Sequence, residues 1–318
     1  MATTPKLAVL LSTYNGGKFL KEQLDSLLGQ TYSNFVVVVR DDGSMDDSLE
    51  ILQAYAAEHP DRFHLVNSTT TATNGGSNNL GACGSFSLLM DYVLQHKTEL
   101  GLEPAYMLFC DQDDVWFENK IERELKCMLE TEAQLDHDAP VLVHSDLAVV
   151  SENRELIANS FTRYQGLETE RNSFCNLAIS NLVTGCTALI NEAAARKALP
   201  IPEGAIMHDW WLGLVAAGFG QIVFIDAPLV HYRQHGSNTI GAKEHQQATL
   251  SDKSFLNRLL SLEPNEHLFE VAEQAAAFLE RHGGELAEHE MRGLLVAARM
   301  KTRVGLLQRM HFRRARRY

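Results

Sequence analysis

The first half of the sequence alternates short apolar runs with amphipathic helical patterns. The runs LAVLLS (7–12), FVVVV (35–39) and YMLFC (106–110) lack the polar alternation of half-exposed strands, so we expect strands that are covered on both faces. Helical patterns lie between them, at 18–28, 46–59 and 85–96. This order predicts an α/β fold, in which right-handed crossovers build a mixed, mainly parallel sheet.

Polar clusters follow three of the expected strands. They are TYNGG (13–17), RDDGS (40–44) and DQDD (111–114). Because ligands bind outside the carboxyl ends of the strands in such sheets, we expect these clusters to converge on one edge and to form a site there.

The second half of the sequence is less regular. Strand-like runs occur at 141–150, 181–190, 221–226 and 228–236, and a helical pattern begins near His208. The β pattern stops after Gly241, and residues 251–312 have a helical composition. We therefore predict an α/β domain over 1–241 and a helical C-terminal extension with a basic tail over 242–318.

Charge separates the tail from the rest of the chain. The net charge is −13, but the last eighteen residues contain seven Lys or Arg and no acid, so the other 300 residues carry −20. An acidic body argues against a nucleic-acid partner. No apolar run approaches the roughly 20 residues of a membrane helix, and the start has no charged leader, so we expect a cytoplasmic protein with reduced cysteines.

The carboxylates in DQDD repel one another unless something lies between them. Residues two apart on an extended chain share a face, which places Asp111 and Asp113 together. All-oxygen ligands of this kind suit Mg²⁺ or Mn²⁺. The alternative is that these acids cap the following helix, a role that we expect for Asp114.

Six motifs in order resemble glycosyltransferase family 2. They are LLSTYNGGKFLKEQLDSLLGQTY, VVVVRDDGSMDDS, NLGACGSF, FCDQDDVW, MHDWWLGLVAAGFG and YRQHGSNTIG, which span about residues 6 to 241. Within the family, the bacterial rhamnosyltransferase-like members are the most similar. The resemblance implies the GT-A fold, a Rossmann-like arrangement of nucleotide-diphospho-sugar transferases, and an inverting, metal-dependent transferase with Mg²⁺ or Mn²⁺.

The resemblance also assigns residues. It implies a donor site at the strand ends that comprises Ser12, Thr13, Tyr14, Asp41, Asp42, Asn79, Gly81, Asp111 and Arg233. Asp41 or Asp42 would hydrogen-bond a pyrimidine base, and Arg233 would contact phosphate. The metal ligands would be Asp113, Asp111 and His235. Asp209 would be the general base, although an Asp before WWLGL is also a good helix N-cap.

Substrates follow only from the resemblance. It implies a dTDP- or UDP-sugar donor, with rhamnose as one candidate sugar, and a saccharide or lipid-linked saccharide acceptor, as in polysaccharide biosynthesis for the cell envelope. The chain lacks the QxxRW box and the membrane segments of processive synthases, which favours transfer of one or a few sugars. His208 stands where relatives often have Glu and has no assigned role. Trp116, Trp210 and Trp211 could stack on sugars, although we expect at least one of them in the core.

Two other functions stay open at this point. One is a catalytically silent subunit that binds nucleotide sugars, and the other is a sugar nucleotidyltransferase with a similar pocket. The basic tail adds a membrane hypothesis, since Val304, Leu307 and Met310 lie among arginines and suit a helix at the inner face of the cell membrane. The alternative is a solvated basic helix end.

Overall fold

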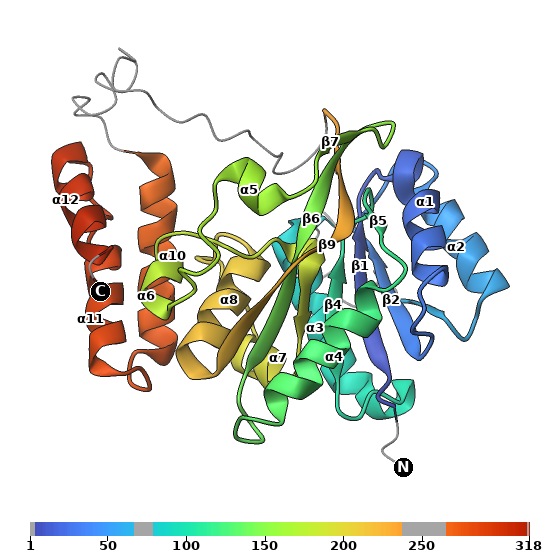
Figure 1. The fold of residues 1–318 in the computed structure, drawn as a ribbon, viewed down its shortest axis with the longest axis horizontal. Coiled ribbons are helices and arrows are strands. Elements are labelled where there is room, and N and C mark those ends of the chain that lie inside the picture. Colours follow the sequence, from blue (N-terminus) through green and yellow to red (C-terminus); the bar gives the residue numbers. More distant parts are fainter. Residues whose placement is uncertain (1–3, 67–78, 237–264, 317) are drawn as a thin grey trace.

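The computed structural model describes residues 4–66, 79–236, 265–316 and 318. The predicted α/β architecture is confirmed, with a curved central sheet between two layers of helices (Figure 1). In the part of the chain described, the sheet has nine strands in the order β3-β2-β1-β4-β8-β6-β9-β5, and β7 (Leu156–Ala158) pairs with β6.

The N-terminal half of the sheet is parallel, as predicted. It consists of β1 (Leu7–Thr13), β2 (Phe35–Asp41), β3 (Phe63–Leu65) and β4 (Tyr106–Cys110). Thr13 is in register with Asp41, and Leu11 is in register with Cys110. The polar clusters after β1, β2 and β4 therefore leave the sheet at the same edge.

The other half of the sheet mixes directions. The strand β8 (Ala188–Ile190) lies antiparallel between β4 and β6 (Val141–Ser151). The runs at 221–226 and 228–236 form one long strand, β9 (Gln221–Gln234), which is parallel to β6 with register shifts between Ser145 and Ala148. A short antiparallel strand, β5 (Val115–Trp116), pairs with β9 directly after DQDD. This pairing returns the end of β9 to the loop after β4.

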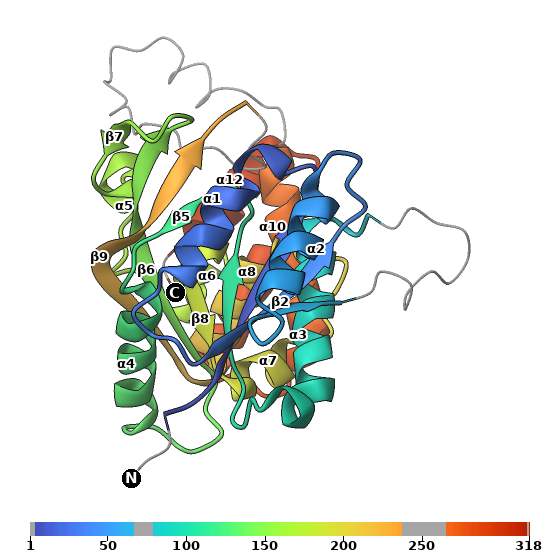
Figure 2. The same cartoon turned by 90° about the vertical axis from the view of Figure 1, so that its right-hand side faces the viewer.

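Helices cover both faces because successive strand residues point to opposite sides. Leu7, Val9 and Leu11 enter one core and Ala8 and Leu10 the other. The first core is covered by α1 (Gly17–Leu28), α2 (Ser48–Glu58) and α4 (Lys120–Glu132). The second is covered by α3 (Gly81–Leu100), α7 (Glu192–Ala198) and α8 (His208–Phe219) (Figure 2). Shorter helices are α5 (Phe161–Gln165), α6 (Phe174–Leu177) and a 3₁₀ turn at Gly185–Thr187.

The C-terminal helices pack against the second core. They are α10 (Glu266–His282), α11 (Glu288–Ala298) and α12 (Gly305–Ala315), at the side of the molecule away from α1 and α2 (Figure 1). The ring of Phe278 lies 5.0 Å from that of Trp211 and 5.4 Å from that of Phe174, so these helices share apolar packing with α6 and α8. The predicted boundary at 241/242 lies outside the described residues.

Among the residues that the structure describes, no helix combines the length and the apolar character needed to cross a bilayer.

The three tryptophans lie in the core. The indole N–H of Trp210 donates to the carbonyl of Leu177, and that of Trp211 donates to the carbonyl of Ala198. Trp116 is buried as well. Stacking of these rings on a sugar is therefore wrong: they are core residues.

Candidate active site

The loops that follow β1 and β2 are joined by side-chain hydrogen bonds. The hydroxyl of Thr13 donates to Oδ1 of Asp41 over 3.0 Å, and the same carboxylate accepts the N–H of Ser44. In the next turn, the N–H of Met45 donates to Oδ1 of Asn15. Asp41 thus remains half-buried at the strand end, where it stabilises its own turn and links it to β1.

A second link joins the loop after β1 to DQDD. The N–H of Tyr14 donates to Oε1 of Gln112 over 2.8 Å, and Nε2 of Gln112 donates to the carbonyl of Tyr14 over 3.1 Å. A side chain at Gly16 would lie 2.2 Å from Oε1 of Gln112, so this close approach needs glycine. Tyr14 is 45% exposed and Ser12 is half-buried beside it. No sequence pattern indicates the role of Gln112, because its partner is ninety-eight residues away.

Asp42 connects β2 to the start of α3. It is 2% exposed and forms an ion pair with the buried Arg40. Its Oδ1 accepts the N–H of Leu80 over 2.9 Å, and its Oδ2 accepts the N–H of Gly81 over 2.8 Å. Asn79 caps the same turn, and its Oδ1 accepts the N–H of Gly81, which has a φ of +66°. A nucleotide base would have to compete with these contacts for Asp42.

Two of the predicted metal ligands meet in space. Nε2 of His235 lies 2.7 Å from Oδ2 of Asp113, although the two residues are 122 positions apart. Both side chains are largely buried, and the ring of Phe19 lies 4.7 Å from the imidazole ring. The pairing of β5 with β9 produces this contact, since it places the end of β9 beside DQDD.

The third predicted ligand lies in a region of concentrated negative charge. Burial, followed by the charges of Asp113 and Asp209, raises the pKa of Asp111 to about 7. Carboxylates from the loop after β4 and from α8 therefore influence one another. A divalent cation would relieve this repulsion.

The predicted metal ligands are of types that a hard cation accepts. Asp111, Asp113 and His235 supply two carboxylates and an imidazole, a donor set that Mg²⁺ and Mn²⁺ accept. Among the residues that the structure describes, however, the group of three such side chains whose ligand atoms all lie within 4.8 Å of one another is Asp111, Asp114 and Cys186, whereas of the predicted ligands only Asp113 and His235 are in direct contact. Burial raises the pKa of the Cys186 thiol well above its ordinary value, so it stays protonated and is a poor ligand for a hard cation.

Asp114 does not cap the following helix, and that prediction is wrong. The helix α4 begins at Lys120 with Asn119 as its N-cap. Asp114 is fully buried instead, and its Oδ1 accepts the N–H of Arg233 over 3.1 Å. It therefore fastens β9 to the loop that carries Asp113.

Arg233 occupies a position that differs from the predicted phosphate contact. Its side chain is 2% exposed, and its Nε donates to the carbonyl of Asp113 over 2.8 Å. The rest of the guanidinium donates to the carbonyl of Glu152 and to Oε2 of Glu22. The geometry favours a positioning role, in which Arg233 holds the loop of predicted metal ligands against α1.

Asp209 lies in the first turn of α8, with Met207 as the N-cap. It is 8% exposed, and its Oδ1 accepts the N–H of Trp210 over 2.6 Å and Nδ2 of Asn181 over 3.4 Å. Burial raises its pKa to about 6, although these hydrogen bonds lower it. A carboxylate with such a pKa is a suitable proton acceptor near neutral pH.

His208 is a packing residue beneath this site. Its ring lies 4.3 Å from that of Phe86 and 5.1 Å from that of Phe109. Neither ring nitrogen has a hydrogen-bond partner among the described residues, and burial lowers the pKa of His208 to about 3. A side chain at Gly185 would lie 2.9 Å from its Nε2. The neutral ring therefore supports the start of α8.

Comparisons with known proteins agree on a family. Residues 8–196 match the profile of the family described as glycosyl transferase family 2. A dTDP-rhamnosyl transferase, RfbG from Shigella flexneri, is 25% identical over 237 residues, which are 73% of this chain and 74% of the relative.

Solved structures agree on the fold. TarS 1–349 from S. aureus in complex with UDP-GlcNAc aligns with a TM-score of 0.57 and 17% identity, over 92% of this chain and 70% of that one. The mannosyltransferase PcManGT from Pyrobaculum calidifontis, with GDP-Man and Mn²⁺, aligns with a TM-score of 0.54 and 14% identity, over 93% and 70%.

Proposed function

Because the chain belongs to glycosyl transferase family 2, we propose that it transfers a sugar from a nucleoside-diphosphate donor to a saccharide or lipid-linked saccharide acceptor with inversion. The observation that carries this proposal is the meeting of Asp113 and His235 at the carboxyl edge of the sheet, with Asp209 close enough to raise the pKa of Asp111. One edge would thus hold both a cation site and a proton acceptor.

The residues at this edge take separate roles in the proposal. Asp111, Asp113 and His235 would hold Mg²⁺ or Mn²⁺, which when bound neutralises the charge of the leaving diphosphate. The backbone around Ser12 and Tyr14 would line the nucleotide base. Asp41 is better placed than Asp42 to meet the base, since Asp41 is half-buried whereas Asp42 is 2% exposed.

Asp209 would act as the general base. As the acceptor oxygen forms its bond to the anomeric carbon, its proton moves to the Asp209 carboxylate, and the bond from that carbon to the diphosphate oxygen breaks. One attack on the face opposite the leaving group inverts the configuration. Hydrogen bonds from Trp210 and Asn181 hold the carboxylate in place for the transfer.

The donor is the first feature to test. The named activity of the Shigella relative supports dTDP-rhamnose, and the UDP-GlcNAc bound to TarS makes UDP-sugars the next choice. We expect one pyrimidine donor with Mn²⁺ to raise the melting temperature. A donor concentration of a hundred times Kd adds about 2.7 kcal/mol to the free energy of unfolding. Thermal shift over a panel of dTDP-, UDP- and GDP-sugars, with and without Mn²⁺, measures this. No stabilisation by any donor would contradict the proposal.

The same panel separates the two alternatives. A silent binding subunit would be stabilised by a donor but would neither hydrolyse it nor transfer its sugar. A sugar nucleotidyltransferase would release pyrophosphate from a nucleoside triphosphate and a sugar phosphate. Burial raises the pKa of Asp209 to about 6, which suits a proton acceptor. This favours the transferase over both alternatives.

The helix α12 supports a location at the inner face of the cell membrane. Leu306, Leu307 and Met310 are exposed on it, and Arg313 and Arg314 continue the exposed surface. The tail contains no acid, while the body is strongly acidic. An apolar surface next to arginines suits a bilayer of anionic lipids, where a lipid-linked acceptor would also lie.

Charge reversal tests this membrane contact. We expect Arg313→Glu with Arg314→Glu to weaken partition onto phosphatidylglycerol vesicles by about 30-fold, because each basic residue near the surface contributes about 1 kcal/mol. Arg123→Glu with Lys126→Glu on α4 is the matched control, since it makes the same charge change at two exposed positions of a distant helix. Equal loss in both double variants in co-sedimentation would contradict a specific role for α12.

A further inference from the structure

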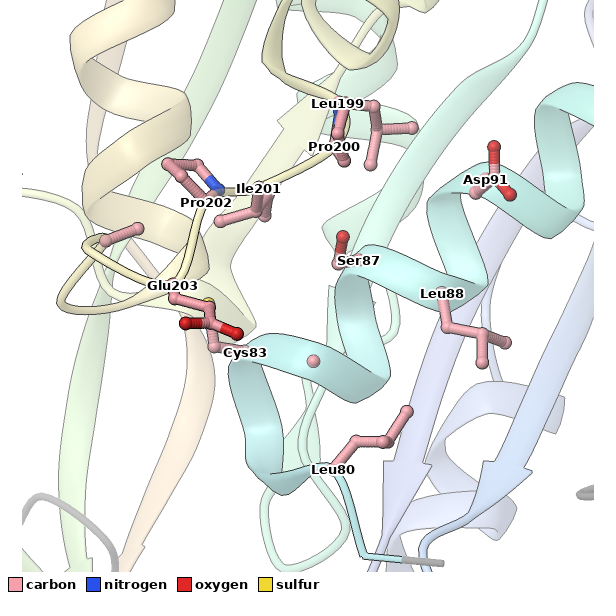
Figure 3. Close-up of a pocket in the computed structure, with 12 residues that line it drawn as sticks. Leu80, Cys83, Ser87, Leu88, Asp91, Leu199, Pro200, Ile201, Pro202 and Glu203 are labelled. Carbon is pink, nitrogen blue, oxygen red and sulfur yellow. The ribbon is translucent and has the colours of Figure 1, made fainter. Parts of the chain in front are cut away.

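A groove of about 740 Å³ lies beside the candidate active site, and none of the proposed donor, metal or catalytic residues lines it. It runs between the N-terminal half of α3 and the segment 199–205, which joins α7 to α8 (Figure 3). Leu80 and Cys83 lie at one end, and Asp91 lies further along the same helix. Its volume is in the range of sites that hold small ligands.

One end of the groove lies near the start of α8, because the ring of Phe86, the neighbour of Ser87 on α3, lies 4.3 Å from that of His208, the neighbour of Asp209. Leu80, which lines it, donates its backbone N–H to Asp42 at the carboxyl end of β2. Cys83 also lines it, and the pKa of its thiol is raised to about 11 by burial and then by the charge of Asp209. The groove therefore opens within electrostatic range of the proposed base.

The lining of the groove selects a class of ligand. Apolar side chains such as Leu88, Ile201 and Pro202 form much of its walls, and Ser87 and Glu203 add polar groups. None of its lining residues, all within the described ranges, is Lys, Arg or His. Apolar walls can pack against the C–H face of a sugar ring, and carboxylates can accept hydrogen bonds from its hydroxyl groups. A phosphate or a sugar acid would meet repulsion instead.

Building on the proposed function, we propose that this groove binds the acceptor as an uncharged saccharide. The reacting hydroxyl would lie at the Cys83 end, where Asp209 can accept its proton, and further sugar units would extend along α3 toward Asp91. The donor would stay on the other side of Asp209, above the ends of β1, β2 and β4.

The test compares two tryptophan variants on α3. Ser87→Trp fills the groove, whereas Glu99→Trp places the same side chain at an exposed position near the far end of the helix. Binding of p-nitrophenyl glycosides of neutral hexoses and 6-deoxyhexoses is measured by ligand-observed NMR with UDP and Mn²⁺ present. We expect wild type and Glu99→Trp to bind them and Ser87→Trp to bind at least about tenfold more weakly.

A charge variant keeps the proposal testable if Ser87→Trp fails to fold. Wild type should prefer neutral glycosides to p-nitrophenyl glucuronide, and Glu203→Lys, at an exposed position, should gain glucuronide binding. Three results would overturn the proposal: no neutral glycoside binds wild type, Ser87→Trp binds like Glu99→Trp, or Glu203→Lys leaves the preference unchanged. Failure of the proposed function is separate, because it appears as loss of Mn²⁺-dependent donor stabilisation in wild type.

Discussion

Replacing Asp209 by asparagine is expected to lower the rate of sugar transfer by about 10³-fold, within the range that a general base contributes. Asparagine keeps an oxygen to accept the N–H of Trp210 but cannot take a proton from the acceptor. Donor binding should therefore change little. Transfer is measured with the donor that the thermal-shift panel identifies, and Asp226→Asn, the same change at an exposed ion pair with Arg163, is the control.

The same substitution should make the protein more stable at neutral pH. Burial raises the pKa of Asp209 from 3.8 to about 6, so the folded state holds the proton more tightly than the unfolded chain. The charged carboxylate therefore costs stability as the pH rises between these values. We expect Asp209→Asn to gain about 3 kcal/mol in urea unfolding at pH 8 and nothing below pH about 4.

The pH profile of transfer provides the matching measurement. Because only the ionised Asp209 accepts a proton, the wild-type rate should fall as the pH drops through about 6. A variant that keeps its transfer rate, or that loses stability at pH 8, would show that the carboxylate is a structural anchor for α8 rather than a base.

The edge of the sheet was predictable from the sequence because its signals are local. Continuous apolar runs identified β1, β2 and β4, and the polar residues directly after them had to leave at one edge of a parallel sheet. Asp41 and Asp111 were found in this way. Periodicity alone also indicated the helices between the strands.

The partners of the buried charges could not be predicted in the same way. Asp114 and Arg233 meet only because β5 pairs with β9, and a sequence pattern does not specify pairing across 119 positions. From the sequence, Asp114 is expected to cap a helix, and the family resemblance implies that Arg233 contacts phosphate. In the structure both side chains are buried, and their contacts position the loop of predicted metal ligands. His208 is similar, since its packing on Phe86 and Phe109 depends on three separate elements.

The burial of the tryptophans could not be predicted from the sequence for a related reason. An indole has one polar group, and a buried backbone carbonyl satisfies it as well as a ligand does. The indole N–H groups of Trp210 and Trp211 each donate to such a carbonyl, so both rings remain buried at the start of α8. Aromatic residues close to the site include Tyr14, which is exposed, and Phe19, whose ring lies 4.7 Å from that of His235.

Replacing Asp113 by asparagine should weaken Mn²⁺-dependent donor binding by at least about 100-fold, since even residues that only orient metal ligands contribute 10–100-fold. The contact between Asp113 and His235 makes the effect of a second change predictable. His235→Gln alone should also weaken binding, and the double variant should lose less than the product of the two losses, because both act on one cation. Isothermal titration with Mn²⁺ and the identified donor measures all three.

The competing ligand group gives this experiment a clear alternative. If Asp113→Asn binds Mn²⁺ and donor like wild type, while Cys186→Ser loses both, then the cation lies among Asp111, Asp114 and Cys186. That result requires the Cys186 thiol to lose its proton against the effect of burial, which raises its pKa. Such a site would favour Zn²⁺ or Cd²⁺ over Mg²⁺, because thiolate is a soft ligand. The preference among metals therefore separates the two sites even before any sugar is transferred.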